Sequence, residues 1–357
     1  MESLAVSNRS TEARWRLSEY QFALPPELIA QVPAERRDGA RLMILDRSRG
    51  ALQHSRVQEL SERLQPGDLL VVNDTKVVPA RLFGRTASGG AVEVLVIRAL
   101  GESTWLCLGK PARRLREGVS LSFPDKARAT VAAIHGNGHY SIAFDEGAPV
   151  DALLERHGEI PLPPYIRRPD GPLPLDRTRY QTIFASNPGA IAAPTAGFHF
   201  TDKLISALQQ QGVSLTPLTL HVGPGTFLPV RGDDFRQHVM EAEWYEIPET
   251  TAMRITETKA AGGRVVAVGT TTTRALESAA AAHGSVQPGA GWAHLFITPG
   301  HQFRVIDALF TNFHLPGSTL LLLVSAFAGR ERILAAYAEA VVQRYRFYSY
   351  GDAMLIQ

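Results

Sequence analysis

The feature that most constrains the fold of this chain is a block of short apolar segments between about residues 67 and 150. The segments are rich in β-branched and aromatic residues, which is typical of β-strands. Gly89-Gly90 and Gly136-Asn137-Gly138 stand between segments and favour tight hairpins. About six short antiparallel strands close into a small barrel, because closure removes exposed strand edges. The predicted strands are residues 69–72, 80–85, 92–98, 104–108, 119–123, 130–135 and 140–144.

The chain on either side of this block has a different pattern, in which strands and helices alternate. Residues 264–268 and 305–310 are apolar, and a helical segment follows each of them, at 273–283 and 318–328. This alternation predicts a layered α/β domain that is discontinuous in sequence. The predicted organisation is a loose tail at 1–14, an α/β domain at 15–66 and 151–357, and an inserted antiparallel β-barrel of about six strands at 67–150.

The composition excludes several classes of protein. The formal net charge is +2, which is too small to indicate nucleic-acid binding, so any RNA surface must be a local patch. Cys107 is the only cysteine, and a single thiol excludes an internal disulfide and a Cys-rich zinc site. The longest apolar run, residues 320–328, is about half of the roughly 20 residues that span a bilayer. We therefore expect a cytoplasmic protein without a signal peptide or a membrane partner.

One predicted strand-to-helix turn carries the residues Gly269-Thr270-Thr271-Thr272-Thr273-Arg274. Free backbone N–H groups and hydroxyls at a helix N-terminus suit a carboxylate, a phosphate or a ribose diol. Simple helix capping beside a surface arginine explains the same residues equally well. The turn matches neither the Walker pattern nor G-x-G-x-x-G, so an ordinary nicotinamide or methyltransferase loop is not indicated.

Three histidines occur in turns at predicted strand ends. His199 lies between two phenylalanines, where a structural role is the more common one. His221 precedes the turn Gly223-Pro224-Gly225 and is either a proton carrier or a turn residue. Asn312 and His314 alternate along an extended segment, so both can face one side of a pocket. No histidine pair has the i, i+4 spacing of a metal site, and we expect no metal.

A basic cluster, Lys110, Arg113, Arg114 and Arg116, lies between two predicted strands. It either contacts phosphates or forms an ordinary charged loop. The residues alone predict a soluble α/β enzyme and leave nucleotide binding open.

Many segments in a fixed order resemble those of one family, the S-adenosylmethionine:tRNA ribosyltransferase-isomerases of queuosine biosynthesis. Residues 71–82 read V-V-N-D-T-K-V-V-P-A-R-L, and residues 192–201 read A-A-P-T-A-G-F-H-F-T. Each segment is a weak signal, but so many in this order are highly specific. The similar segments are 24–43, 71–82, 160–166, 179–185, 192–201, 220–230, 266–274, 311–316 and 345–356.

The resemblance implies an α/β fold with an inserted six-stranded barrel, and it implies the reaction. S-adenosylmethionine is the co-substrate that donates a ribosyl group, and no metal is implied. The partner is tRNA carrying 7-aminomethyl-7-deazaguanine at the wobble position. Transfer and isomerisation of the ribosyl group give epoxyqueuosine, adenine and methionine. We expect the enzyme to act as a monomer.

The chemistry requires bases, a proton donor for adenine and a pocket that excludes water. The expected proton-transfer residues are His199, His221, His314, Asp307 and Glu243. The expected substrate-binding residues are Thr195, Gly197, Gly223, Gly225, Thr226, Thr270, Thr271, Arg274, Asn312, Tyr350 and Asp352. The expected tRNA-binding residues are Arg36, Arg37, Lys76, Arg81, Lys110, Arg113, Arg114 and Arg116.

The chain departs from the family pattern at two points. It has Met240-Glu241-Ala242-Glu243 where the family usually shows Met-His-x-Glu, and G-T-T-T-T-R where G-T-T-S-x-R is expected. Three alternatives stay open: an S-adenosylmethionine-dependent RNA methyltransferase, a non-catalytic RNA-binding module, and, because of these departures, a family member repurposed especially through Glu241.

Overall fold

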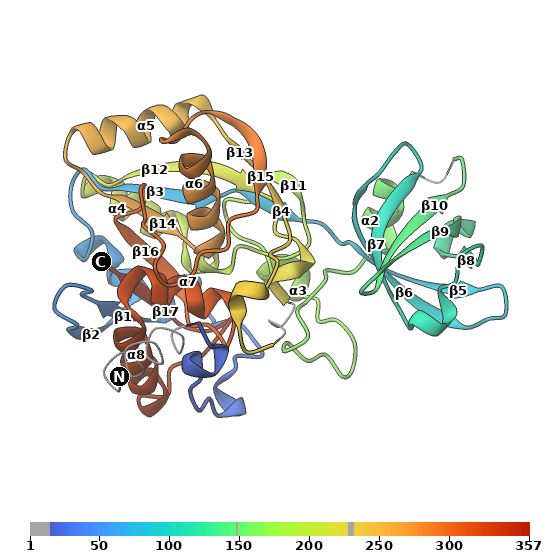
Figure 1. Ribbon diagram of the computed structural model, residues 1–357, viewed down its shortest axis with the longest axis horizontal. Helices are drawn as coiled ribbons and strands as arrows, with labels where there is room; N and C mark the ends of the chain where they lie inside the picture. Colours follow the sequence, from blue (N-terminus) through green and yellow to red (C-terminus); the bar gives the residue numbers. More distant parts are fainter. Residues whose placement is uncertain (1–14, 148, 228–231) are drawn as a thin grey trace, which may run out of the picture.

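The computed structural model describes residues 15–147, 149–227 and 232–357, and Figure 1 shows a large sheet domain with a separate barrel beside it. The large sheet has nine strands and the closed barrel has six, so the predicted α/β fold with an inserted antiparallel barrel is confirmed. Across the large sheet the order is β15 (Gly289–Ala293), β13 (Glu243–Ile247), β12 (Ser214–Leu220), β3 (Leu69–Asn73), β14 (Val265–Val268), β16 (Ala308–Asn312), β17 (Ala353–Ile356), β1 (Arg41–Leu45) and β2 (Leu52–Arg56).

The centre of the large sheet is parallel, which brings the carboxyl ends of its strands to one edge. β12 pairs with β3, β3 with β14, and β14 with β16, all in parallel. Leu69 and Val71 of β3 pack in one core, and Leu70 and Val72 pack in the other, because side chains alternate along a strand. Burial on both faces explains the unbroken apolar run of β3.

Helices cover both faces of this sheet. One core contains side chains of α5 (Glu249–Ala260), α6 (Thr270–His283), α7 (Thr319–Ala328) and α8 (Arg330–Val342). The other core contains side chains of α4 (Asp202–Gln210) and η4 (Val57–Glu62). The predicted cap of α7 is also confirmed, because the Ser318 hydroxyl accepts a hydrogen bond from the backbone N–H of Leu321 at 3.2 Å.

The barrel closes in the order β10-β7-β6-β5-β8-β9, and every one of its paired neighbours is antiparallel. Its core includes Val94, Ile142 and the buried thiol of Cys107, and α2 (Val150–His157) packs Leu153 and Leu154 against it. Its strands are β5 (Arg81–Thr86), β6 (Ala91–Ala99), β7 (Thr104–Lys110), β8 (Ser120–Ser122), β9 (Arg128–Gly136) and β10 (His139–Phe144).

One expected strand needs correction, and the expected N-terminal tail cannot be compared with the structure. The strand at 69–72, predicted for the barrel, is β3 of the large sheet, because its side chains are buried on both faces by the α/β layers. The tail at 1–14 lies outside the described residues. A two-stranded parallel ladder, β4 (Thr75–Val77) with β11 (Asn187–Ala190), follows β3 on the way to the barrel.

The remaining short helices lie mainly in the connections. In the described part of the chain, no helix combines the length and apolarity needed to cross a membrane. The remaining short helices are η1 (Leu17–Tyr20), η2 (Pro26–Leu28), η3 (Arg37–Gly39), η5 (Ala112–Arg114), η6 (Pro124–Lys126), α3 (Asp176–Arg179), η7 (Thr195–His199), η8 (Pro224–Phe227) and η9 (Phe235–Gln237).

Candidate active site

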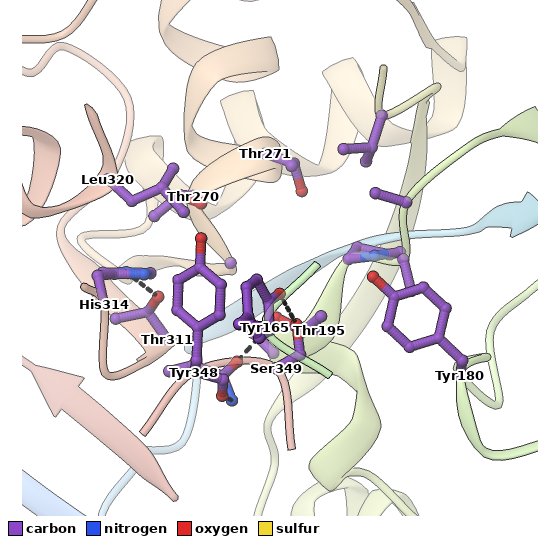
Figure 2. Close-up of a pocket in the computed structure, with 17 residues that line it drawn as sticks. Tyr165, Tyr180, Thr195, Thr270, Thr271, Thr311, His314, Leu320, Tyr348 and Ser349 are labelled. Atoms are coloured by element: carbon purple, nitrogen blue, oxygen red, sulfur yellow. Dashed lines mark hydrogen bonds between the residues drawn. The ribbon is translucent and has the colours of Figure 1, made fainter. Parts of the chain in front are cut away.

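A pocket of about 570 Å³, the main pocket, lies at the carboxyl ends of β14 and β16 (Figure 2). Ligands of open α/β sheets bind at this edge, because the loops that leave the strand ends diverge there. The sequence segments that contribute are far apart, and the walls combine aromatic rings with hydroxyls. The polar lining residues are Tyr165, Tyr180, Thr195, Thr270, Thr271, Thr311, Asn312, His314, Tyr348 and Ser349.

The threonine turn forms one wall of the main pocket. Gly269 has φ +93°, a conformation that favours glycine, and α6 begins directly after it, three residues earlier than predicted. The hydroxyl of Thr272 donates to the carbonyl of Val268 at 2.8 Å, which turns it into the helix. Thr270 and Thr271 line the pocket instead. Their side chains therefore stand beside the first-turn N–H groups of α6, which have no acceptor within the helix.

Asn312 and His314 form a second wall, and both line the main pocket. The amide of Asn312 donates to the carbonyl of Tyr348 at 3.1 Å and lies 3.2 Å from Nε2 of His199. The Thr195 hydroxyl donates to the Asn312 carbonyl oxygen at 3.2 Å. Nε2 of His314 lies 3.1 Å from the Thr311 hydroxyl, and burial lowers the pKa of His314 to about 3. His314 is therefore a neutral imidazole at pH 7.

His199 and Tyr350 do not line the main pocket. Both line a smaller neighbouring cavity of about 280 Å³, which we name the arginine cavity after Arg37, Arg179 and Arg346 in its wall. Burial, together with the positive charge of Arg346, lowers the pKa of His199 to about 4. His199 is thus also neutral at pH 7, and its contact with Asn312 connects it to the main pocket.

His221 is held by its neighbours and is not a lining residue of the main pocket. Its Nδ1 lies 2.8 Å from the Thr75 hydroxyl, and its ring stacks on Trp244 at a centroid distance of 5.0 Å. The ring also packs on Gly189, where an added Cβ would lie 2.7 Å from the imidazole. Burial lowers the pKa of His221. The next residue, Val222, lines the pocket, so His221 supports the wall from behind.

Glu243 and Arg274 form a buried ion pair away from the main pocket. Glu243 also accepts a hydrogen bond from the N–H of Gly223 at 3.0 Å, and Arg274 donates to the carbonyl of Ala293 at 3.1 Å. Burial raises the pKa of the Glu243 carboxyl, and the charge of Arg274 opposes this shift. The pair therefore ties the turn after β12 to β13 and β15, rather than contacting a ligand in the main pocket.

The three expected glycines, Gly197, Gly223 and Gly225, do not line the main pocket. Gly197 packs against Thr182, where an added Cβ would lie 2.8 Å from a methyl group, and it does not line the main pocket. Gly225 packs equally closely on Glu241. The side chain of Thr226 lies outside what the structure describes. Glu241, at the family's histidine position, lies 3.8 Å from Nε2 of His139 on the barrel.

The structure places the two expected aspartates in supporting contacts. Asp307 precedes β16 and pairs with Lys259 at 3.1 Å, at the amino end of the strand. Asn312 lies five residue steps further along the strand, which is roughly 16 Å at about 3.3 Å per residue. Asp352 accepts backbone hydrogen bonds from Arg41 at 2.9 Å and Arg346 at 2.8 Å. Neither carboxylate lines the main pocket.

Sequence reasoning missed the aromatic wall of the main pocket. Tyr165 comes from the Pro-rich stretch at residues 160–174, and its hydroxyl lies 2.6 Å from the Ser349 hydroxyl. Its ring meets Tyr348 edge-to-face at a centroid distance of 3.8 Å. Tyr348 has φ +75°, a rare conformation for a residue with a side chain, and such strain concentrates at functional sites. The available signal was that both tyrosines lie in family-like segments.

The expected tRNA-binding residues lie in three places. Arg81 and Lys110 line a groove of about 1660 Å³ between the barrel and the Pro-rich stretch, where both pair with Glu93, at 3.3 and 3.0 Å. Arg36 pairs with Asp38, whereas Arg37 lines the arginine cavity. Lys76, Arg113 and Arg116 are exposed, and Arg114 donates to the carbonyl of Ala91.

Together, the fold and the main pocket define an α/β enzyme with an inserted barrel, whose main pocket lies at the carboxyl edge of parallel strands. No group of three or more His, Cys, Asp or Glu side chains among the described residues is placed to hold a metal ion. A family model described as queuosine biosynthesis protein matches residues 17–356. The chain belongs to this family.

Curated relatives and a solved structure agree with this assignment. An S-adenosylmethionine:tRNA ribosyltransferase-isomerase of Geotalea uraniireducens (strain Rf4) is 53% identical over 346 residues, covering 96% of this chain and 99% of that protein. The same-named protein of Anaeromyxobacter dehalogenans (strain 2CP-C) is 54% identical over 345 residues, with the same coverage. The crystal structure of an S-adenosylmethionine tRNA ribosyltransferase from Thermotoga maritima is similar at a TM-score of 0.55 and 37% identity, covering 95% of this chain and all of that one.

Proposed function

We infer that this enzyme transfers and isomerises the ribosyl group of S-adenosylmethionine onto 7-aminomethyl-7-deazaguanine at the wobble position of tRNA. The products are epoxyqueuosine in tRNA, adenine and methionine. The observation that carries this conclusion is the main pocket, which family-like segments between residues 165 and 349 build together. Membership of the family and relatives about half identical over nearly the full chain support the same reaction.

The main pocket suits the donor. The N-terminus of α6 with the hydroxyls of Thr270 and Thr271 offers hydrogen-bond donors for the methionine carboxylate. The rings of Tyr165 and Tyr348 offer aromatic faces for the sulfonium and the adenine. These aromatic walls also exclude water, which strengthens every electrostatic interaction with the bound donor.

The neutral histidine of the main pocket suits the proton transfers. The sulfonium acidifies the 5′ hydrogens of the ribose, and removal of one gives an ylide from which adenine can leave. A neutral imidazole at His314 accepts a hydrogen bond from the reacting groups without repelling this cation. We assign His314 and Thr311 to contact with the reacting groups. His199, acting through Asn312, and His221, acting through Val222, are positioning residues in this proposal.

The acceptor tRNA would lie across the barrel and the sheet domain. The groove that contains Arg81 and Lys110 joins these two parts, and the exposed Lys76, Arg113 and Arg116 add positive charge. Contacts of this kind bind phosphates and weaken with salt. The proposal includes action as a monomer in the cytoplasm, where tRNA is available.

The direct test is incubation of the enzyme with S-adenosylmethionine and tRNA that carries the aminomethyl base. Free adenine should appear by chromatography in equal amount to a modified tRNA detected by mass spectrometry. tRNA without the aminomethyl base is the substrate control. A methylated tRNA without adenine would instead identify an RNA methyltransferase and overturn the proposal.

Variants locate the chemistry within the same assay. His314→Gln should slow adenine release, because the side chain in the main pocket loses its imidazole. His294→Gln is the matched control, since His294 is exposed at the end of β15 and lines no part of the main pocket. Equal single-turnover rates for the two variants would remove His314 from the mechanism.

A further inference from the structure

The arginine cavity collects positive charge beside the main pocket. Arg37, Arg179 and Arg346 all line its volume of about 280 Å³. They come from η3, from the end of α3 and from the segment between α8 and β17, so three separate parts of the fold bring them together. Burial lowers the pKa of the Arg37 guanidinium, and the positive charge of Arg179 lowers it further.

These guanidinium groups bond to backbone carbonyls rather than to acids. Arg179 donates to the carbonyl of Ala34 at 2.6 Å, and Arg346 donates to that of Tyr350 at 2.8 Å. Arg37 donates to the carbonyls of Phe198 and Thr178, both at 3.3 Å. Within the described ranges, no carboxylate lies at ion-pair distance from any of the three. Carbonyl contacts orient the guanidinium groups but leave their charge uncompensated.

The acids of this region are already engaged. Asp38 pairs with Arg36 at 3.1 Å, and Asp176 pairs with Arg168 at 2.7 Å. Asp352 accepts two backbone N–H groups. None of these three carboxylates therefore forms an ion pair with Arg37, Arg179 or Arg346.

A buried hydroxyl without a partner lies in the same cavity. Tyr350 is 3% exposed, and its hydroxyl oxygen has no hydrogen-bond partner among the described residues. Burial and the negative charge of Asp176 raise the pKa of this phenol, whereas the positive charges of Arg168, Arg179 and Arg37 lower it, which places the hydroxyl near charged groups of both signs. A buried polar group left unpaired costs free energy, and such a group in a natural protein often awaits a ligand.

The arginine cavity and the main pocket share a wall. Tyr348 and Ser349 line the main pocket, and the next two residues, Tyr350 and Gly351, line the arginine cavity. The contact of His199 with Asn312 crosses the same wall, at 3.2 Å. A group held in the arginine cavity is therefore next to the substrate in the main pocket.

We propose that the arginine cavity binds an oxyanion, and that this oxyanion is a backbone phosphate of the tRNA beside the wobble nucleotide. Guanidinium groups match phosphate oxygens with paired hydrogen bonds, and the Tyr350 hydroxyl adds a further donor. The carboxylate of S-adenosylmethionine has the same chemistry, but the N-terminus of α6 already offers it a site in the main pocket. This inference rests on the proposed function, because it takes tRNA as the substrate.

The test measures tRNA and S-adenosylmethionine affinity separately. Arg179→Gln and Arg346→Gln should each weaken tRNA binding roughly tenfold at low salt, the loss of one charge-assisted contact. The slope of log affinity against log salt should fall in magnitude by about 0.7–0.9 for each lost phosphate contact. The affinity for S-adenosylmethionine should not change. Arg179→Lys keeps the charge and should keep the salt slope.

Tyr350→Phe removes only the unpartnered hydroxyl, so it tests the cavity without disturbing the arginines. It should weaken tRNA binding and leave the free energy of unfolding unchanged or higher, because a buried hydroxyl without a partner is destabilising. A purely structural tyrosine would leave tRNA binding unchanged. Arg177→Gln is the matched control, because Arg177 lies on the same helix, α3, and is exposed outside the cavity.

Each outcome has one reading. Weaker S-adenosylmethionine binding with normal tRNA binding would identify the donor carboxylate as the oxyanion and overturn the proposal. Unchanged affinities for both would also overturn it, even when the wild-type enzyme releases adenine. Absence of adenine release from the wild-type enzyme would overturn the proposed reaction. The salt dependence of tRNA affinity in the variants would still test phosphate binding in the arginine cavity.

Discussion

The buried ion pair between Glu243 and Arg274 gives the sharpest quantitative prediction. Each side chain is 4% exposed, so neither charge is solvated in the folded protein. Substitution of Glu243 by alanine leaves the Arg274 guanidinium buried without its counter-ion, and it removes the acceptor of the Gly223 N–H. The expected loss in the free energy of unfolding is about 3–5 kcal/mol, the range for breaking a buried pair from one side.

The assay is chemical denaturation followed by circular dichroism. Glu331→Ala is the matched control, because Glu331 pairs with Arg330 but its side chain is 80% exposed. An exposed pair contributes at most about 1 kcal/mol. The double variant Glu243→Leu with Arg274→Met should recover much of the loss, since no unpaired charge remains buried.

The same experiment separates a structural glutamate from a catalytic one. A catalytic carboxylate at position 243 would leave the unfolding free energy of Glu243→Ala near the wild-type value while turnover disappears. A loss below about 1 kcal/mol, the size expected for an exposed pair, would refute the reasoning from burial.

Three further predictions concern the histidines and Asp307. Because burial lowers the pKa of His199 to about 4 and that of His314 to about 3, the stability that they contribute is complete above the unfolded value of 6.5 and is lost as the pH falls toward these values. Each pKa shift amounts to roughly 3 kcal/mol or more. His199→Gln and His314→Gln should therefore make the denaturation midpoint less dependent on pH between pH 7 and pH 4. A pH dependence equal to that of the wild type would contradict the burial of neutral imidazoles. Asp307→Asn should keep nearly full adenine release, because Asp307 lies at the other end of β16; complete loss of turnover would show that it reaches the site. Gly189→Ala should slow turnover by pushing the His221 ring from its place, and a normal rate with an unshifted imidazole NMR signal would disprove that contact.

Glu241 stands where the family usually has a histidine, and this difference in charge changes a contact between the large-sheet domain and the barrel. Glu241 lies near Gly225 and 3.8 Å from Nε2 of His139 on the barrel. A histidine at position 241 would place a second imidazole beside that of His139, whereas glutamate places a carboxylate there. The substitution therefore alters how the turn after β12 meets the barrel, and it leaves the walls of the main pocket intact.

The sequence by itself determined the elements of the fold, because their signals lie in neighbouring residues. The alternation of apolar residues and the glycine turns predicted the antiparallel barrel, and the strand–turn–helix pattern predicted α6 and α7. The hydroxyl of Ser318 marked the start of α7 for the same local reason. β3 was assigned to the wrong sheet, since an apolar run of that length does not specify which strands will cover it.

Only the tertiary structure decided which polar residues meet. Tyr165 contacts Ser349 across 184 residues of sequence, and Thr195 contacts Asn312 across 117. No local pattern records such pairs, because they depend on how the parallel strands are ordered and where their ends diverge. The same order carries Asp307 to the far edge of the sheet and buries Glu243 against Arg274, although all three looked like site residues in the sequence.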